Sequence, residues 1–395
     1  LYGRMQSAID QVNRCIQENL TAIRVVKSYV RGDYEVEKFG VVNENLKSES
    51  EKAFGTAVLN MPAMQFVMYG TILGILLIGG RLINEGQMMI GQLTSFLSYV
   101  LLILNSLMMM SNVFLLMTRS LASAERIMEV IDEKIDITDE NAKDIAVAKG
   151  EIEFDHVWFK YKDTAKEYVL SDVSFHIKPG QTVGIIGQTG SSKTTLVQLI
   201  PRLYDVTKGE VKIDGINVKE YPVRHLRDAV AMVLQKNTLF SGSLIDNLRW
   251  GNENATLDEI KEACQIACVD EFVDRLADGY DTEMGQEGVN VSGGQKQRIC
   301  IARAILKKPK VLILDDSTSA VDTATEAKIR SGLAEKLPDM TKIIIAQRIS
   351  SVRHADQIII MDRGHVEAIG THESLLRDNQ IYQEIYASQK EGADL

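Results

Sequence analysis

The chain of 395 residues has little cysteine and fewer basic than acidic residues. Its four cysteines, Cys15, Cys264, Cys268 and Cys300, have no CxxC spacing and no partnering histidine cluster. We therefore interpret them as reduced thiols in a cytosolic compartment, and expect neither a zinc site nor a disulfide framework. The net charge of −10 argues against a broad basic surface for nucleic acid. The chain begins at Leu1 without a signal peptide, and we expect it to be part of a longer protein.

Charge is absent from two long stretches, residues 53–80 and 86–118. Each is long enough for a helix to cross a bilayer, the second with tilt or an interfacial turn. The loop between them, residues 81–85, is short and nearly neutral. Basic residues lie beyond both outer ends: Arg24, Lys27, Arg31 and Lys38 on one side, Arg119 and Arg126 on the other.

By the positive-inside bias, both ends of this hairpin face the cytoplasm. The alternative for each span is a buried helix of a soluble domain. We predict membrane spans at about residues 57–80 and 88–118, within a membrane region that covers residues 1–128. Two helices cannot enclose a polar path, so further helices must come from missing sequence and from a partner.

A charged segment at residues 129–149 is predicted to be a linker, and a different domain is expected over residues 150–395. Apolar and polar residues alternate at 151–161, which indicates a half-buried strand. Continuous apolar runs at 183–186, 311–314 and 343–346 indicate a parallel sheet covered on both faces. These runs end at Gly187, Asp315 and Gln347. Ligands bind beyond the carboxyl ends of such strands, so the three positions should converge.

A glycine loop followed by Lys and Thr joins the first run to a helical pattern at residues 196–203. This order predicts a phosphate cradle, in which Lys193 reaches the terminal phosphates and the Thr194 hydroxyl binds Mg²⁺. Ser192 stands where the last glycine of such a loop belongs, and it adds a Cβ to a tight turn. A plain Gly/Ser turn is the alternative. The residues expected to bind nucleotide are Gly187, Thr189, Gly190, Ser191, Ser192, Lys193, Thr194 and Thr195.

Two adjacent carboxylates end the second run. Asp315 suits Mg²⁺ through water, and Asp316 stands where a residue that aligns the attacking water is needed. A strand that ends in an acidic turn is the alternative. Between these elements, Ser292, Gly293, Gly294 and Gln295 open a helical pattern at residues 299–306. Their backbone N–H groups form a second anion-binding terminus, unless this is only a capped helix after a flexible turn.

Taken together, these motifs over residues 150–390 resemble the nucleotide-binding domain of the ATP-binding cassette (ABC) family, in its exporter arrangement. The resemblance implies ATP and Mg²⁺ as ligands. It assigns Tyr161 to stacking on adenine, and Gln235 to contact with Mg²⁺ and to sensing of the membrane domain. Residues 292–295 resemble the family signature, residues 319–322 the loop that crosses the dimer interface, and residues 282–288 an exporter-type segment.

The resemblance extends upstream. Residues 18–28 look like the second intracellular coupling helix of an exporter, and the two spans correspond to its fifth and sixth membrane helices. A solvated amphipathic helix is the alternative for residues 18–28. The expected fold is therefore multi-domain: a transmembrane α-helical hairpin, then an α/β P-loop nucleotide-binding domain with a helical subdomain.

Departures from the family pattern fall on the catalytic positions. Asp316 stands where glutamate is usual, and Gln347 where histidine is usual. A carboxylate withdrawn by one methylene is misplaced by roughly 1 Å, which can cost on the order of 10²-fold in rate. Gln347 carries neither a charge nor a transferable proton. We thus predict that this site binds ATP but hydrolyses it slowly.

In the family, two nucleotide-binding domains close head to tail, and each signature completes the other chain's site. The signature here is intact, so we predict a heterodimeric exporter of the cytoplasmic (inner) membrane, with a partner that carries Glu and His at the departed positions. The alternatives are a homodimer with slow hydrolysis and a nucleotide-gated regulator that transports nothing. The transported substrate is not predicted, and no nucleic-acid partner is expected.

Overall fold

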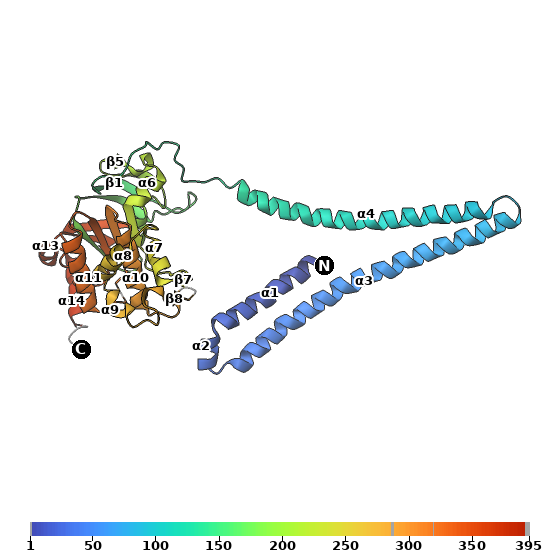
Figure 1. Cartoon of the computed structure of the whole chain (residues 1–395), viewed down its shortest axis with the longest axis horizontal. Helices are drawn as coiled ribbons and strands as arrows, with labels where there is room; N and C mark the ends of the chain where they lie inside the picture. The colour runs from blue at the N-terminus through green and yellow to red at the C-terminus, as the bar shows by residue number, and fades with distance from the viewer. Residues whose placement is uncertain (1, 286–287, 319, 392–395) are drawn as a thin grey trace. The chain divides into compact units, whose positions relative to one another are not determined.

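The computed structural model describes residues 2–285, 288–318 and 320–391, so the predictions that fall on Gln286, Glu287 and Ser319 lie outside it. The chain separates into two compact units, Leu1–Glu133 and Lys134–Leu395. Figure 1 shows the first as long helices, coloured blue to cyan, and the second as a mixed α/β body, coloured green to red. Each unit is described by itself.

The first unit contains α1 (Tyr2–Thr21), α2 (Ile23–Ser28), α3 (Gly32–Asn84) and α4 (Ile90–Ile131). Helix α1 lies beside the start of α3, and Asn19 Nδ2 donates to Glu35 Oε2 at 2.7 Å (Figure 1). The helix predicted at residues 18–28 is divided between α1 and α2. The break falls at Ala22, whose φ of −97° and ψ of 14° depart from helical values. No glycine or proline marks it, so the sequence gives no signal for the break.

The hairpin turn lies later in the chain than predicted. Helix α3 continues to Asn84, and Arg81 within the predicted loop pairs with Glu85 one helical turn on, at 3.0 Å. The predicted loop at residues 81–85 is therefore wrong, and the reversal occurs around Gly86, which has φ of +70°. Helix α4 also runs on to Ile131, so the first residues of the predicted linker are helical.

Segments Pro62–Asn84 and Ile90–Leu107 are long and apolar enough to cross a membrane. Only 6% of the first and 0% of the second is buried within the structure, which is unlike the core helix of a soluble domain. Large apolar side chains such as Phe66, Leu77 and Leu102 are exposed along them. Such surfaces require a lipid or protein environment.

The second unit is built on a six-stranded sheet in the order β12-β11-β3-β10-β9-β6. Its strands are β3 (Thr182–Ile186), β6 (Val230–Val233), β9 (Val311–Asp315), β10 (Thr341–Ile345), β11 (Gln357–Asp362) and β12 (His365–Gly370). All adjacent pairs are parallel except β11 and β12. Strand β10 lies between β3 and β9, so the three apolar runs are neighbours.

Both faces of this sheet are buried, because successive residues of one strand enter different cores. Ile344 belongs to one hydrophobic cluster, whereas Ile343 and Ile345 belong to the other. This alternation explains why the strands are continuous apolar runs. The predicted parallel sheet covered on both faces is confirmed.

A four-stranded antiparallel sheet, in the order β2-β1-β4-β5, lies against the second core. Its strands are β1 (Ile152–Phe159), β2 (Leu170–Ile177), β4 (Lys208–Ile213) and β5 (Ile216–Asn217). A separate two-stranded antiparallel sheet pairs β7 (Gly242–Ser243) with β8 (Glu283–Met284). The helices are α5 (Lys193–Gln198), α6 (Val223–Ala229), α7 (Leu244–Arg249), α8 (Leu257–Ile266), α9 (Asp270–Val273), α10 (Gly293–Leu306), α11 (Thr323–Lys336), α12 (Ile349–Val352), α13 (His372–Asp378) and α14 (Gln380–Glu391). Helix α5 is shorter than the helical pattern predicted at residues 196–203.

Candidate functional site

The ends of β3, β9 and β10 open into one pocket of about 310 Å³. The pocket is lined by Thr189, Gly190, Ser191, Ser192, Lys193, Thr194, Thr195, Gln235, Asp315, Asp316, Ile345 and Gln347. The sheet brings together residues far apart in the chain, as we predicted from the positions at which the apolar runs end. Gly187 lies at the base of the same loop, where a Cβ would come within 2.1 Å of the Met361 carbonyl oxygen. A side chain at that position would displace the loop.

Ser192 occupies a glycine-like conformation at the N-cap of α5. Its φ of 69° and ψ of 23° are left-handed, a region that costs an L residue roughly 1–2 kcal/mol. Gly190, two residues earlier, has φ of +85° and no atom within 4 Å of an added Cβ. The loop therefore keeps the shape of a phosphate cradle, at the cost of strain at Ser192.

Lys193 folds back over the loop. Its Nζ donates to the carbonyl oxygens of Gly187 and Gln188 at 2.8 and 2.9 Å, and to Ser191 Oγ at 3.2 Å. Burial lowers the pKa of this amine, and the carboxylates of Asp315 and Asp316 oppose that shift. The charge thus lies at the centre of the loop, where a phosphate would take over its hydrogen bonds.

Asp315 and Thr194 offer hard oxygen ligands. Thr194 Oγ1 donates to Asp315 Oδ1 at 3.2 Å, and Asp315 Oδ2 is buried without a hydrogen-bond partner. Burial raises the pKa of Asp315, since an uncompensated carboxylate is costly there. A divalent cation would satisfy Oδ2, and an oxygen set of one hydroxyl, one carboxylate and phosphates is what Mg²⁺ prefers. The residues present therefore fit Mg²⁺, with the Gln235 amide on the wall of the same pocket.

The side chains of Asp316 and Gln347 are hydrogen-bonded to each other. Gln347 Nε2 donates to Asp316 Oδ2 at 2.9 Å, and Asp316 has a left-handed backbone with φ of 47°. Burial raises the pKa of Asp316, whereas the bond from Gln347 and the charge of Lys193 lower it. The amide stabilises the carboxylate but cannot exchange a proton with it.

Tyr161 follows β1 at the rim of this region. Its hydroxyl lies 2.9 Å from Thr195 Oγ1, and its ring meets the ring of Tyr204 edge to face at 5.1 Å. The side chain is 51% exposed. An exposed aromatic face fixed by its hydroxyl can receive a base, and Tyr204 is a neighbour that the motif alone did not indicate.

The predicted signature lies outside the phosphate pocket. Ser292 caps α10: its Oγ accepts from Gln295 N at 3.3 Å, and Gln295 Oε1 accepts from Ser292 N at 2.8 Å. A Cβ on Gly293 would meet only Ala320 Cβ at 3.6 Å, whereas one on Gly294 would lie 2.7 Å from the Ala320 carbonyl oxygen. Gly294 is thus required by this chain's own packing, and Gly293 is open to an approaching molecule.

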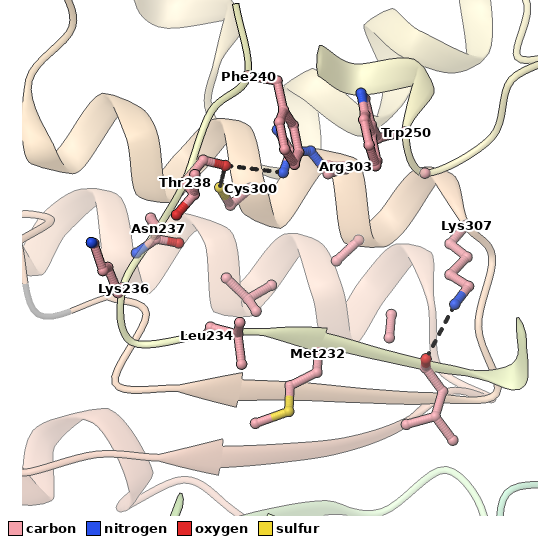
Figure 2. A pocket seen from close by; sticks show the side chains of 15 residues that line it. Met232, Leu234, Lys236, Asn237, Thr238, Phe240, Trp250, Cys300, Arg303 and Lys307 are labelled. Carbon is pink, nitrogen blue, oxygen red and sulfur yellow. Dashed lines mark hydrogen bonds between the residues drawn. The ribbon is translucent and has the colours of Figure 1, made fainter. Parts of the chain in front are cut away.

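A second hollow of similar volume, about 310 Å³, lies beside β6 and α10. Figure 2 shows Phe240 and Trp250 stacked on one side of it, with ring centroids 4.1 Å apart. Two of its three basic lining residues donate to backbone: Arg303 to the carbonyl oxygens of Asn247 and Thr238, and Lys307 to that of Val230. The charges of Arg303 and Lys307 are therefore committed to the protein's own backbone.

Two family models match the chain: "ABC transporter" over residues 170–319, and "ABC transporter transmembrane region" over residues 1–107. The uncharacterized ABC transporter ATP-binding protein YfiB of Bacillus subtilis is 41% identical over 396 residues, which span 100% of this chain and 68% of that protein. The putative multidrug export ATP-binding/permease protein YgaD of Bacillus subtilis is 36% identical over 98% of this chain and 68% of its own.

Among solved structures, a bacterial Atm1-family ABC exporter with ATP bound superimposes with a TM-score of 0.88 at 28% identity. The match covers 98% of this chain and 68% of that chain. Both units of the present chain therefore have counterparts in a single known architecture.

Proposed function

The chain belongs to the ABC transporter family, with a membrane region fused to a nucleotide-binding domain, and we propose that it drives export of a substrate across the cytoplasmic membrane as one half of a dimer. The domain boundaries proposed are a membrane region at residues 1–128, a linker at 129–149 and the nucleotide-binding domain at 150–395. The membrane region is multi-pass, and the nucleotide-binding domain is cytoplasmic. The proposed partners of the membrane region are the lipid bilayer and a second half-transporter.

The observation that carries this proposal is the buried, unpartnered Asp315 Oδ2 beside Thr194 and Lys193. A cation and a phosphate supply the missing partners together, which Mg²⁺-ATP does and free nucleoside does not. Tyr161 at the rim receives the base. ATP and Mg²⁺ are thus the proposed ligands of this site.

We further propose that this site hydrolyses ATP slowly. The Asp316 carboxylate is held by Gln347 and falls short of the usual glutamate by one methylene, and Gln347 has no transferable proton to replace the usual histidine. Ser292, Gly293, Gly294 and Gln295 keep the form of an anion-binding helix terminus, with Gly293 open to an approaching phosphate. They complete the site of a partner chain that carries Glu and His. A homodimer with two slow sites is the competing proposal.

Coupling to the membrane region is proposed to run through Gln235 and α2. Helix α2 has no buried residue, and Ile23 and Val25 expose apolar side chains that need a partner. Substitution of Ile23 or Val26 by Asp is expected to separate ATP turnover from vesicle transport while nucleotide binding is retained. Normal transport at a normal ratio to turnover would exclude α2 from this role.

Nucleotide binding is tested with Lys193→Ala in the purified full-length complex. Photolabelling of this chain by 8-azido-ATP should fall at least tenfold, because the substitution removes the Lys193 amine. Among the described residues, this is the only amine in contact with the loop. Lys307→Ala is a matched control, since Lys307 is also half-buried and bonded to backbone carbonyls but lies in the other hollow. Equal labelling of wild type and Lys193→Ala would refute the proposed site.

A further inference from the structure

The carboxamide of Gln389, near the end of α14, bonds the backbone on both sides of Arg348. Its Nε2 donates to the Gln347 carbonyl oxygen at 2.7 Å, and its Oε1 accepts from the Ile349 N–H at 2.8 Å. One side chain thus uses both its donor and its acceptor on a loop that lies 42 and 40 positions earlier in the chain. A bidentate contact of this kind fixes orientation as well as distance.

The two backbone groups have no regular partner of their own. Ile349 is the first residue of α12, and N–H groups in the first turn of a helix lack an intrahelical acceptor. The Gln347 carbonyl lies between β10 and α12, outside both elements. Gln389 therefore supplies hydrogen bonds that the loop cannot make within itself.

Helix α14 is firmly anchored where Gln389 projects from it. Tyr382 is fully buried, and its hydroxyl lies 2.7 Å from His372 Nδ1. Ile385 and Tyr386 pack on the same hydrophobic cluster. Gln389 comes seven residues after Tyr382, which is two helical turns, so it lies on the anchored face. The helix holds the carboxamide in place against the loop.

The loop carries Gln347, whose side chain reaches Asp316 in the phosphate pocket. We propose that Gln389 is a positioning residue for nucleotide: it fixes the backbone of Gln347 so that this amide faces the terminal phosphate of ATP. This inference rests on the proposed function. It makes the C-terminal helix part of the machinery that distinguishes ATP from ADP, because only ATP carries the phosphate that Gln347 would meet.

The test compares Gln389→Met with Gln383→Met in the full-length complex. Methionine keeps the length and helix propensity of glutamine but makes no such hydrogen bonds. Gln383 is a matched control on the same helix, because its amide donates to the Leu376 and Arg377 carbonyl oxygens and does not contact the loop. ATP and ADP each compete with 8-azido-ATP for labelling of this chain, and hydrogen exchange is followed over residues 347–352.

Gln389→Met loses both hydrogen bonds to the loop, so it should weaken ATP about fivefold relative to ADP and speed exchange of residues 347–352 by at least that factor. ADP affinity should not change, and Gln383→Met should match wild type in both measurements. Gln389→Glu keeps the acceptor for Ile349 but loses the donor to Gln347, so it should lose ATP preference while Ile349 stays protected.

An unchanged preference for ATP over ADP in both Gln389 variants would overturn the inference. Failure of either nucleotide to compete in the wild-type complex would instead contradict the proposed function.

Discussion

Two parts of the second unit, the pocket at the strand ends and the start of α10, differ in backbone strain and in how their polar groups are hydrogen-bonded. In the phosphate pocket, Ser192 is strained at φ of 69°, and Asp316 at φ of 47° is bonded to the Gln347 amide. At the start of α10, Ser292 and Gln295 form a regular reciprocal cap, and a Cβ on Gly293 would make only an ordinary contact with Ala320 Cβ at 3.6 Å. The first part departs from the family pattern and the second does not. The comparison teaches that departures from the family pattern can fall on one of these parts while the other keeps its regular form.

The largest expected effect on ATP hydrolysis comes from a change at the start of α10, which keeps the family pattern. Gly293→Leu should reduce steady-state ATP hydrolysis by the full-length complex on the order of 10²-fold, because a side chain there keeps a partner's γ-phosphate from the helix N–H groups. An added Cβ at Gly293 would make an ordinary contact with Ala320 Cβ at 3.6 Å, so we expect the domain to fold with this change. Gly40→Leu, on an exposed position of α3 without positive φ and with no atom within 4 Å of an added Cβ, provides a surface control. Near-wild-type hydrolysis by Gly293→Leu would remove the signature from the partner's site.

The second largest expected effect is a gain in the rate of ATP hydrolysis at this chain's own site. Asp316→Glu combined with Gln347→His should raise single-turnover hydrolysis at this site by roughly 10- to 10²-fold, because the carboxylate regains one methylene of reach and the loop gains a proton donor. The measurement uses a complex whose partner site has been inactivated. Asp316→Glu alone should give a smaller gain, since Gln347 would still hold the carboxylate. If the double variant stayed as slow as wild type, the departures would not explain slow turnover.

Much of this site could be predicted from the sequence because its residues follow buried strands. The three apolar runs predicted adjacent parallel strands, and their ends place Lys193, Asp315 and Gln347 in one pocket. The rule that ligands bind beyond carboxyl strand ends carried that prediction. Local chain chemistry therefore indicated the long-range arrangement.

Other features had no local signal. The Gln389 contact joins residues about 40 positions apart through a surface-type amide, and only tertiary packing of α14 on Tyr382 brings them together. The break at Ala22 lacks glycine and proline, and the antiparallel β2, β4 and β5 are too short or too mixed to have been predicted. The hairpin turn was misplaced because Arg81 is charged yet helical, bonded to Glu85.

A modest effect is expected from Ser192→Gly. Glycine adopts φ of 69° without the penalty that Ser pays, which is about 1 kcal/mol. The bound loop then no longer pays this strain, so ATP should bind roughly fivefold more tightly if the free loop can leave the left-handed conformation and ATP binding requires it. Titration with a fluorescent ATP analogue measures this. Thr189→Gly is the control, because Thr189 is an exposed residue of the same loop and does not have positive φ; an equal gain there would point to general loosening of the loop.

The smallest effect is expected from Asp316→Asn, although it changes the residue nearest the chemistry. If the partner's site performs nearly all hydrolysis, loss of this carboxylate should lower the steady-state rate of the complex less than twofold. Asn keeps the size of Asp and an oxygen that can accept from Gln347 Nε2, so the 2.9 Å bond need not be lost. A homodimer predicts the opposite result, because both of its sites would depend on Asp316. ATP hydrolysis by the purified full-length complex decides between them, and a collapse with Asp316→Asn, at normal ATP labelling of this chain, would establish that this slow site is the working one.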